Sequence, residues 1–146
     1  MTGKLMEYFN RQPRLGVIST SSQDGRVDSA VYGSPQMIDE KTVIVALARG
    51  RTWANLQDNP HAVYMIMQPG EGLMDWKGVR VYLRMLEYAD SGPRLEAYKR
   101  EMARVVGEQA ARMIAVLATF EVEEIRPLID FGQGWEKGIL YGSGGS

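Results

Sequence analysis

Residues 42–56 read TVIVALARGRTWANL, an apolar run that leads directly into two arginines, a glycine and the start of a helix. The β-branched and apolar residues from Thr42 to Ala48 predict a strand, and the run is apolar enough to be buried on both faces. A helix is expected from Thr52 to Asp58, because Pro60 follows. The loop between these two elements therefore lies at a helix N-terminus, where backbone N–H groups have no intrahelical partners.

The loop residues Arg49, Gly50, Arg51 and Thr52 are suited to holding a phosphate. Aligned peptide dipoles place about half a positive charge at a helix N-terminus, so an anion is stabilised there. The two arginines offer planar forks for phosphate oxygens, Gly50 lets a ligand approach the backbone, and Thr52 can donate its hydroxyl while capping the helix. The alternative is a solvated turn whose arginines only cover surface, and the glycine spacing of a P-loop is absent.

The composition is that of one globular domain. The chain has 146 residues, 45% of them hydrophobic, which is enough for a single core. We expect the domain to span residues 1–141 and the Gly/Ser-rich residues 142–146 to be disordered. The 17 basic and 18 acidic residues balance, so nucleic acid is not an expected partner. The chain lacks an apolar run long enough for a membrane span and the apolar core of a signal peptide, so we expect a cytoplasmic protein with no membrane partner.

Few side chains in the sequence could carry chemistry on their own. There is no cysteine, which excludes disulfides, thiolate metal sites and iron–sulfur clusters. His61 is the single histidine, and its place after Asn59-Pro60 indicates a surface residue and not a catalytic one. Tyr32 and Tyr82 lie in predicted strands, where an aromatic side chain is more often packed than reactive. The catalytic residues therefore stay unknown, and a bound phosphorylated cofactor would supply any chemistry.

Strands dominate the rest of the chain. A hairpin is expected around the Asp24-Gly25 turn, and a helix opens at Pro93 and runs to about residue 106. The apolar stripe of this helix consists of Leu95, Tyr98, Met102 and Val105. The expected strands are 15–20, 27–33, 35–38, 42–48, 62–67, 79–88 and 114–122. This order predicts a mainly β fold with short helices (α+β class), built as an antiparallel barrel or curved sheet of six or seven strands.

Four segments carry a resemblance to a known family. They are LGVIST at 15–20 with Asp24-Gly25, the strand 28–33, RTWANL at 51–56 with Asn59-Pro60, and GVRV at 78–81. Their order and spacing resemble the pyridoxamine 5'-phosphate oxidase-like family and its small FMN-binding relatives, over roughly residues 5–127. The resemblance implies a six- to seven-stranded antiparallel split β-barrel.

The resemblance also implies where FMN would bind. In the family, the basic and hydroxyl residues that open the short helix hold the FMN phosphate, which corresponds here to Arg51 and Thr52, with Arg49 and Gly50 beside them. The family lays the edge of the isoalloxazine ring along the backbone of the second strand, whose residues here are Ser29, Ala30, Val31, Tyr32 and Gly33. Relatives often carry Asn or Thr on this strand, whereas Ala30, Val31 and Tyr32 stand here, so the side chains that would make polar contacts to the ring are not identified. The same fold could instead use F420 or haem.

Members of the family are usually homodimers with the flavin at the subunit interface, so a homodimer is expected here. The apolar residues that could cover such an interface, or else fill the core of one chain, are Met65, Met67, Met74, Trp76 and Trp135. Met65 and Met67 are expected to fill the core of one chain. Gly132, Gly134 and Gly138 argue against a regular helix around Trp135, and we expect a loop that brings this tryptophan against the partner's flavin.

The implied function is that of a flavoprotein, an FMN-dependent oxidoreductase that passes electrons between the flavin and a small-molecule substrate or NAD(P)H. A non-catalytic, FMN-binding electron carrier is the alternative. A true pyridoxamine 5'-phosphate oxidase is disfavoured, because the C-terminal stretch offers only Arg126 and Lys137 to bind a substrate phosphate.

Overall fold

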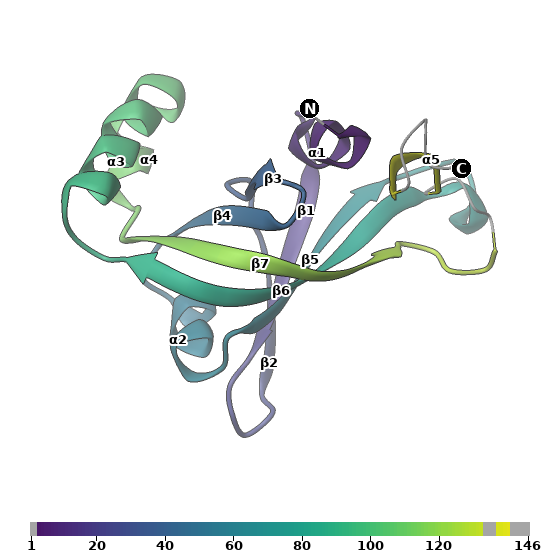
Figure 1. Ribbon diagram of the computed structural model, residues 1–146, viewed down its shortest axis with the longest axis horizontal. Helices are drawn as coiled ribbons and strands as arrows, with labels where there is room; N and C mark the ends of the chain where they lie inside the picture. The colour runs from purple at the N-terminus through teal and green to yellow at the C-terminus, as the bar shows by residue number, and fades with distance from the viewer. Residues whose placement is uncertain (1–2, 133–136, 141–146) are drawn as a thin grey trace.

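A computed structural model describes residues 3–132 and 137–140, and within these ranges seven strands form one antiparallel sheet (Figure 1). The strands are β1 (Leu15–Ser21), β2 (Val27–Val31), β3 (Gln36–Asp39), β4 (Thr42–Leu47), β5 (His61–Gln68), β6 (Lys77–Ala89) and β7 (Val116–Pro127). Their order across the sheet is β2-β1-β5-β6-β7-β4-β3. The helices are α1 (Lys4–Asn10), α2 (Arg51–Asp58), α3 (Pro93–Val106), α4 (Glu108–Arg112) and α5 (Lys137–Leu140), with a 3-10 helix, η1, at Leu73–Asp75. This confirms the mainly β, antiparallel split barrel expected from the sequence.

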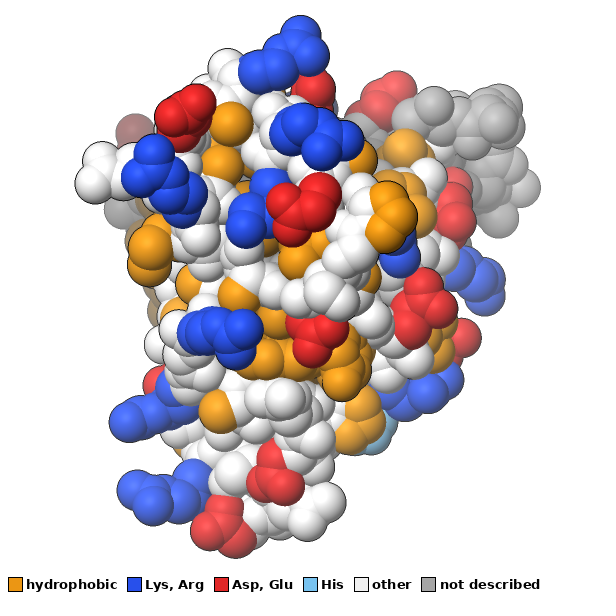
Figure 2. Space-filling view, turned by 90° about the vertical axis from the view of Figure 1, so that its left-hand side faces the viewer, with side chains coloured by type: hydrophobic (Ala, Val, Ile, Leu, Met, Phe, Trp, Pro, Cys, Tyr) orange, Lys and Arg blue, Asp and Glu red, His pale blue; other side chains and the backbone are white. Residues whose placement is uncertain are grey.

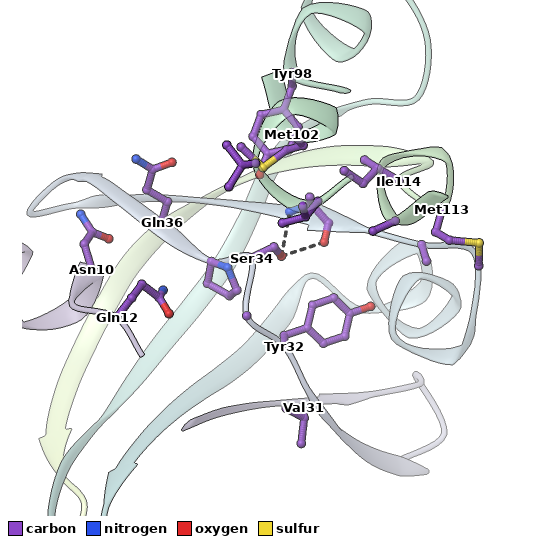
Figure 3. A pocket seen from close by; sticks show the side chains of 17 residues that line it. Asn10, Gln12, Val31, Tyr32, Ser34, Gln36, Tyr98, Met102, Met113 and Ile114 are labelled. Atoms are coloured by element: carbon purple, nitrogen blue, oxygen red, sulfur yellow. Dashed lines mark hydrogen bonds between the residues drawn. The ribbon is translucent and has the colours of Figure 1, made fainter. Parts of the chain in front are cut away.

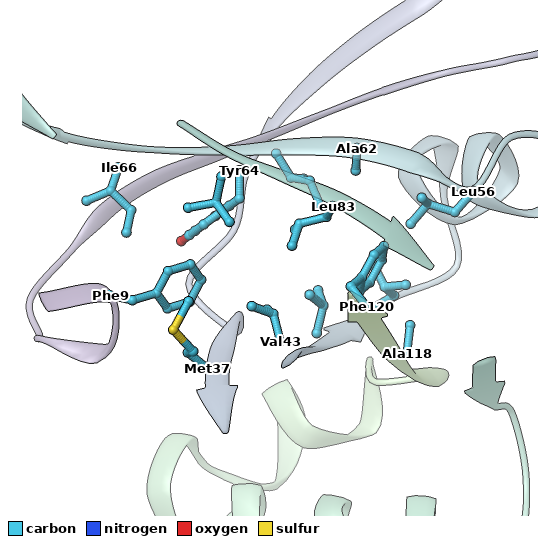
Figure 4. Packing of buried hydrophobic residues seen from close by; sticks show 14 of the residues in the cluster. Phe9, Met37, Val43, Leu56, Ala62, Tyr64, Ile66, Leu83, Ala118 and Phe120 are labelled. Carbon is cyan, nitrogen blue, oxygen red and sulfur yellow. The ribbon is translucent and has the colours of Figure 1, made fainter. Parts of the chain in front are cut away.

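The core lies inside the curve of the sheet, because alternate side chains of each strand point to the same face. On β1, for example, Ile18 is buried while Ser19 is half exposed. The buried side chains that meet inside are mostly large and apolar, and include Phe9, Met37, Val43, Leu56, Tyr64, Leu83 and Phe120 (Figure 4). Gly16 of β1 makes room for the Tyr64 ring, since a Cβ at this position would overlap the Tyr64 hydroxyl group.

The connection between β2 and β3 ties the two ends of the sheet together through side chains. The Ser34 hydroxyl donates to the carbonyl of Ala46 in β4 at 2.8 Å and accepts from the N–H of the same residue at 3.2 Å. Beside it, the Arg14 guanidinium donates to the carbonyl oxygens of Gly33 and Pro35 at 2.8 and 2.7 Å. These contacts fix the segment that follows β2, which matters because this segment belongs to the predicted site.

Helices α3 and α4 cover one end of the sheet (Figure 1). Beneath them Ala46 packs with Leu95 and Leu117 in a second apolar cluster, while Val43 earlier on β4 faces the main core. Ile44 is only half buried, because it precedes the part of the strand that α3 covers. The expectation that the whole run is buried on both faces is therefore wrong for its first half.

The predicted element positions differ from the structure mainly in the C-terminal half. Strand β7 runs on to Pro127 because it pairs with β6 along its length. Helix α4 was not predicted, and Gly107, with φ 94°, ends α3 and begins it. Gly138 lies in the one-turn helix α5, where a glycine costs only about 1 kcal/mol. Trp135 lies outside the described residues.

Candidate functional site

The predicted phosphate loop lies where β4 leaves the sheet. Arg49 and Gly50 connect the strand to α2, which begins at Arg51. Gly50 occupies the N-cap position with an extended backbone (φ 172°), which any residue can adopt. A Cβ at Gly50 would meet no described atom within 4 Å. The backbone of this loop is therefore open to an approaching ligand.

The N-terminus of α2 concentrates positive charge. Its first turn contains Arg51 and no acidic residue, so the arginine adds to the positive end of the helix dipole instead of neutralising it. Asp28 of β2 pairs with Arg51 at 3.8 Å between guanidinium nitrogen and carboxylate oxygen. The Arg51 side chain is 76% exposed, and an exposed pair contributes about 1 kcal/mol or less. An anion can therefore compete with Asp28 for the guanidinium.

Thr52 does not cap α2, and that part of the prediction is wrong. Gly50 holds the N-cap position without a side-chain hydrogen bond, and Thr52 is the second residue of the helix and only 5% exposed. On the same buried face, the Asn55 side-chain amide donates to the Thr20 hydroxyl at 3.1 Å. These contacts fix the position of α2 against β1, and with it the direction of the N–H groups at its first turn. Contact between the Thr52 hydroxyl and a phosphate stays a prediction.

The second predicted part of the site, residues 29–33, comprises the end of the edge strand β2 and the residues after it. The Tyr32 N–H donates to a β1 carbonyl at 3.0 Å. Hydrogen-bonded positions alternate along an antiparallel ladder, so Ala30 also directs its backbone groups to β1, whereas Ser29 and Val31 direct theirs to the free edge. Ser29 and Val31 therefore offer their backbone groups to a ligand, whereas Ala30 and Tyr32 do not, and the Gly33 carbonyl already accepts from Arg14.

The structure brings the two predicted parts of the site side by side, because α2 packs against β1 and β2. A cleft of about 780 Å³, called the apolar cleft below, extends from both (Figures 2 and 3). It is lined from the β2 side by Val31, Tyr32 and Gly33. Ala48, which directly precedes Arg49, lines it from the phosphate-loop side. This volume lies within the range of known small-molecule sites.

The walls of the apolar cleft carry no charge. Helix α3 and the region of α4 form one wall, with the labelled side chains of Tyr98, Met102, Met113 and Ile114 in Figure 3. None of the described residues that line the cleft is Asp, Glu, Lys, Arg or His. Burial raises the pKa of Tyr98, so its phenol is neutral. Figure 2 shows the same property from outside, as hydrophobic side chains gathered in a hollow with charged side chains around it.

Arg14 was not predicted as a site residue, yet it holds the floor of the cleft in place. Besides Gly33 and Pro35, its guanidinium donates to the Phe9 carbonyl at 2.7 Å, and it lies over the rings of Phe9 and Tyr64 at 5.3 and 5.2 Å from their centroids. Burial lowers the pKa of Arg14, and the neighbouring Tyr64 opposes this shift. This role has no signal in the sequence, because the partners of Arg14 are backbone carbonyls of other segments.

The apolar wall was also missed as part of the site. Its α3 residues belong to the predicted apolar stripe of this helix, and of that stripe only Leu95 is fully buried. Tyr98 and Met102 are half buried and Val105 is 68% exposed. The sequence carries no signal that separates the two roles, because a helix that packs on a sheet and a helix that lines a cleft share the same apolar spacing.

His61 lies on the surface, as predicted. It begins β5, its side chain is 60% exposed, and its Nδ1 is 3.5 Å from a Glu123 carboxylate oxygen. Arg84 joins the same group through Glu123 at 3.5 Å and Glu121 at 2.9 Å, which are cross-strand ion pairs. In the described part of the chain, no cluster of three His, Cys, Asp or Glu residues is placed to hold a metal ion. Nor does any helix there combine the length and hydrophobicity needed to cross a bilayer.

Comparison with known proteins identifies the fold. No protein-family model matches the sequence, and no curated protein matches it closely. Among solved structures, an FMN-binding protein from Syntrophomonas wolfei subsp. wolfei superposes with a TM-score of 0.69 at 20% identity, over 88% of this chain and 84% of that one. HupZ of Group A Streptococcus gives 0.66 at 22% identity, over 88% and 92% of the two chains.

A putative pyridoxamine 5'-phosphate oxidase from Lactobacillus delbrueckii gives a TM-score of 0.59 at 16% identity, over 86% of this chain and 93% of that one. The chain therefore has the split-barrel fold of the pyridoxamine 5'-phosphate oxidase-like proteins. Further structures of this fold are an F420 reductase, a FAD-binding protein from Mesorhizobium loti, and HutZ, the heme storage protein of Vibrio cholerae.

Proposed function

We propose that the protein binds FMN, with the phosphate at the N-terminus of α2 and the ring between the free edge of β2 and the apolar cleft. The observation that carries this proposal is the juxtaposition of a positively charged helix N-terminus, an edge strand with unpaired backbone groups and an uncharged cleft. A flavin nucleotide needs all three, because it combines an anionic phosphate with a flat ring that is apolar on its faces and polar on one edge.

The residues present fit this cofactor. Arg49, Arg51 and the N–H groups of the first turn of α2 would hold the phosphate, and backbone groups of Ser29 and Val31 would contact the polar edge of the ring. Haem fits less well, because His61 is the single histidine and lies outside the cleft, so an iron ligand would have to be a Tyr or Met. Structures of the same fold from proteins named for FMN, FAD and F420 support a flavin-type cofactor.

We further propose that the protein is an oxidoreductase that passes electrons between the flavin and a small-molecule substrate or NAD(P)H. The bound flavin would supply the redox chemistry. The chain would bind the cofactor, orient it and exclude water, since none of the described cleft residues is a carboxylate, histidine or lysine that could act as a general base. For the same reason, a non-catalytic electron carrier is the competing function.

A homodimer is proposed as the working form. Val17 stands opposite Val31 on β2 and opposite Met65 on β5, so three apolar side chains form a row across the outer face of the sheet. Val31 is 72% exposed, and Met65 and Met67 are half exposed on this face, so the expectation that the two methionines fill the core of one chain is wrong. A second copy would bury this row. Light scattering of the FMN-bound protein should give the mass of two chains, and the mass of a single chain at micromolar concentration would contradict the proposal.

The absorbance spectrum of freshly purified protein tests the cofactor. Bands of oxidised flavin are expected, and apoprotein titrated with FMN should recover them. A colourless protein that binds haemin but not FMN would overturn the flavin proposal. Steady-state oxidation of NAD(P)H by the FMN-bound protein then separates the two functions, because a carrier exchanges electrons with a partner protein without turning over a small molecule.

A further inference from the structure

We propose that the part of the apolar cleft formed by α3 and α4 binds an uncharged, flat and mainly apolar organic molecule, which is the substrate of the proposed flavin site. This rests on the proposed function, and it adds the chemical class of the molecule that reacts there. The inference comes from three properties of the cleft: its exposed apolar wall, the lack of charged side chains among its described lining residues, and its position.

The apolar wall is larger than the fold itself requires. Leu95 anchors α3 to the sheet over Ala46 and Leu117, and Tyr98 packs against the same cluster. Around the cleft, Val105, Val106 and Met113 nevertheless expose 68%, 55% and 66% of their surface. Adjacent large apolar side chains left exposed in this way mark a binding surface more often than a structural one.

Of the six polar side chains that line the cleft among the described residues, those of Asn10 and Ser34 are occupied by contacts within the chain. The Asn10 amide both donates to the Met37 carbonyl and accepts from the Met37 N–H, each at 2.8 Å. The Ser34 hydroxyl is used twice by Ala46. The polar side chains left for a ligand are then the amides of Gln12 and Gln36 and the hydroxyls of two tyrosines, among the described residues.

This lining selects against charge in the ligand. A carboxylate or phosphate in the α3–α4 part of the cleft would lose its hydration and find no cation among the described lining residues, so its binding there is unfavourable. A flat apolar molecule loses little hydration energy and buries against Met102, Val105 and Met113. The positive charge of the site is instead at the N-terminus of α2, where the phosphate of the cofactor is proposed to bind. The phosphate of the cofactor would thus bind in the positively charged part of the site, and the substrate would bind in the apolar part.

The experiment uses the FMN-saturated protein and two fluorescent probes. Nile red is uncharged, flat and apolar, and 1-anilinonaphthalene-8-sulfonate is an apolar dye with an anionic group. We expect Nile red to bind saturably without displacing FMN, and the sulfonate to bind about tenfold more weakly or worse. Displacement of FMN by Nile red would overturn the inference, because the dye would then occupy the cofactor position.

A matched pair of variants on α3 locates the dye. Met102 lines the cleft, whereas Ala97 is on the same helix, is exposed and does not line it. Met102→Glu should weaken Nile red binding about tenfold or more, and Ala97→Glu should leave it unchanged. Equal effects of the two variants would overturn the inference.

Two further outcomes separate this inference from the proposed function. If FMN binds and Nile red does not, the substrate site is refuted while the flavin site stands. If Nile red binds at Met102 and FMN does not bind at all, the flavin proposal fails, and the substrate assignment fails with it. Dye binding that appears only when the protein dissociates on dilution would assign the cleft to an interface with a second copy and overturn the inference.

Discussion

Replacing Arg51 with alanine tests the phosphate end of the proposed site. A charge-assisted hydrogen bond from a guanidinium to a phosphate contributes about 1.5–3 kcal/mol. The Arg51 side chain is 76% exposed, so solvent screening favours the lower part of that range. Asp28, now 3.8 Å from the guanidinium, would face the phosphate without its partner and add some repulsion. We therefore expect a loss of about 2 kcal/mol in FMN binding, which is about thirtyfold in Kd.

The assay is a titration of apoprotein with FMN and, separately, with riboflavin, followed by flavin fluorescence. Arg51→Ala should weaken FMN about thirtyfold and riboflavin less than about twofold, because riboflavin has no phosphate. Arg104→Ala is the matched control, since Arg104 is 79% exposed and pairs with Glu101 at 3.4 Å on α3. It should change neither affinity. Asp28→Asn should strengthen FMN binding, because it removes the competing carboxylate.

Equal weakening of FMN and riboflavin by Arg51→Ala would refute the reasoning. It would mean that Arg51 supports the fold of the loop, or contacts the ring, and does not recognise the phosphate. Thermal unfolding of the variant, measured without ligand, distinguishes a damaged loop from a lost ligand contact.

Three further predictions concern stability. Arg14→Met should lower the free energy of unfolding in urea by about 2–4 kcal/mol, because three backbone carbonyls lose their donor, whereas Arg112→Met, at an exposed side chain, should change it by less than about 0.5 kcal/mol. Gly16→Ala should lower the same free energy by about 1–3 kcal/mol, because the new methyl group overlaps the buried Tyr64 ring, whereas Gly50→Ala, with open space and an extended backbone, should be nearly neutral. Comparable effects of the two substitutions would contradict the packing argument. Burial raises the pKa of Tyr8 from 10.0 to about 12, so the unfolded chain loses this proton at a lower pH than the folded chain, and the free energy of unfolding should fall as pH rises from about 10 to about 12. Tyr8→Phe should reduce that fall, as measured by urea unfolding at each pH.

The fold could be predicted largely from the sequence because its signals are local. Alternating burial along β5, the turn at Asp24-Gly25 and the apolar run of β4 each follow from a few neighbouring residues. The start of α2 is the instructive exception. Gly50 and Thr52 are both acceptable N-cap residues, and only the burial of Thr52 against the barrel makes Gly50 the cap.

The candidate site was less predictable, because its parts meet through long-range contacts. The pairing of Arg51 with Asp28 depends on α2 packing against a hairpin more than twenty residues earlier in the chain. The α3 stripe reads as core in the sequence, since a helix that packs on a sheet and a helix that lines a cleft share the same apolar spacing. Only the tertiary structure shows that Leu95 alone is fully buried.

The short stretch from Ala46 to Thr52 explains why charge and apolarity are separated in the site. Ala46 must be small and apolar because α3 packs on it, and Ala48 continues that surface into the cleft. The strand ends at Leu47, so Arg49 and Arg51 lie outside the sheet, where an arginine side chain is solvated and its charge is not unfavourable. Helix α2 begins at this boundary, so the positive end of its dipole lies beside the arginines. It adds to their positive charge and leaves the cleft uncharged. A ligand that is anionic at one end and apolar at the other is therefore matched by a single strand-to-helix junction.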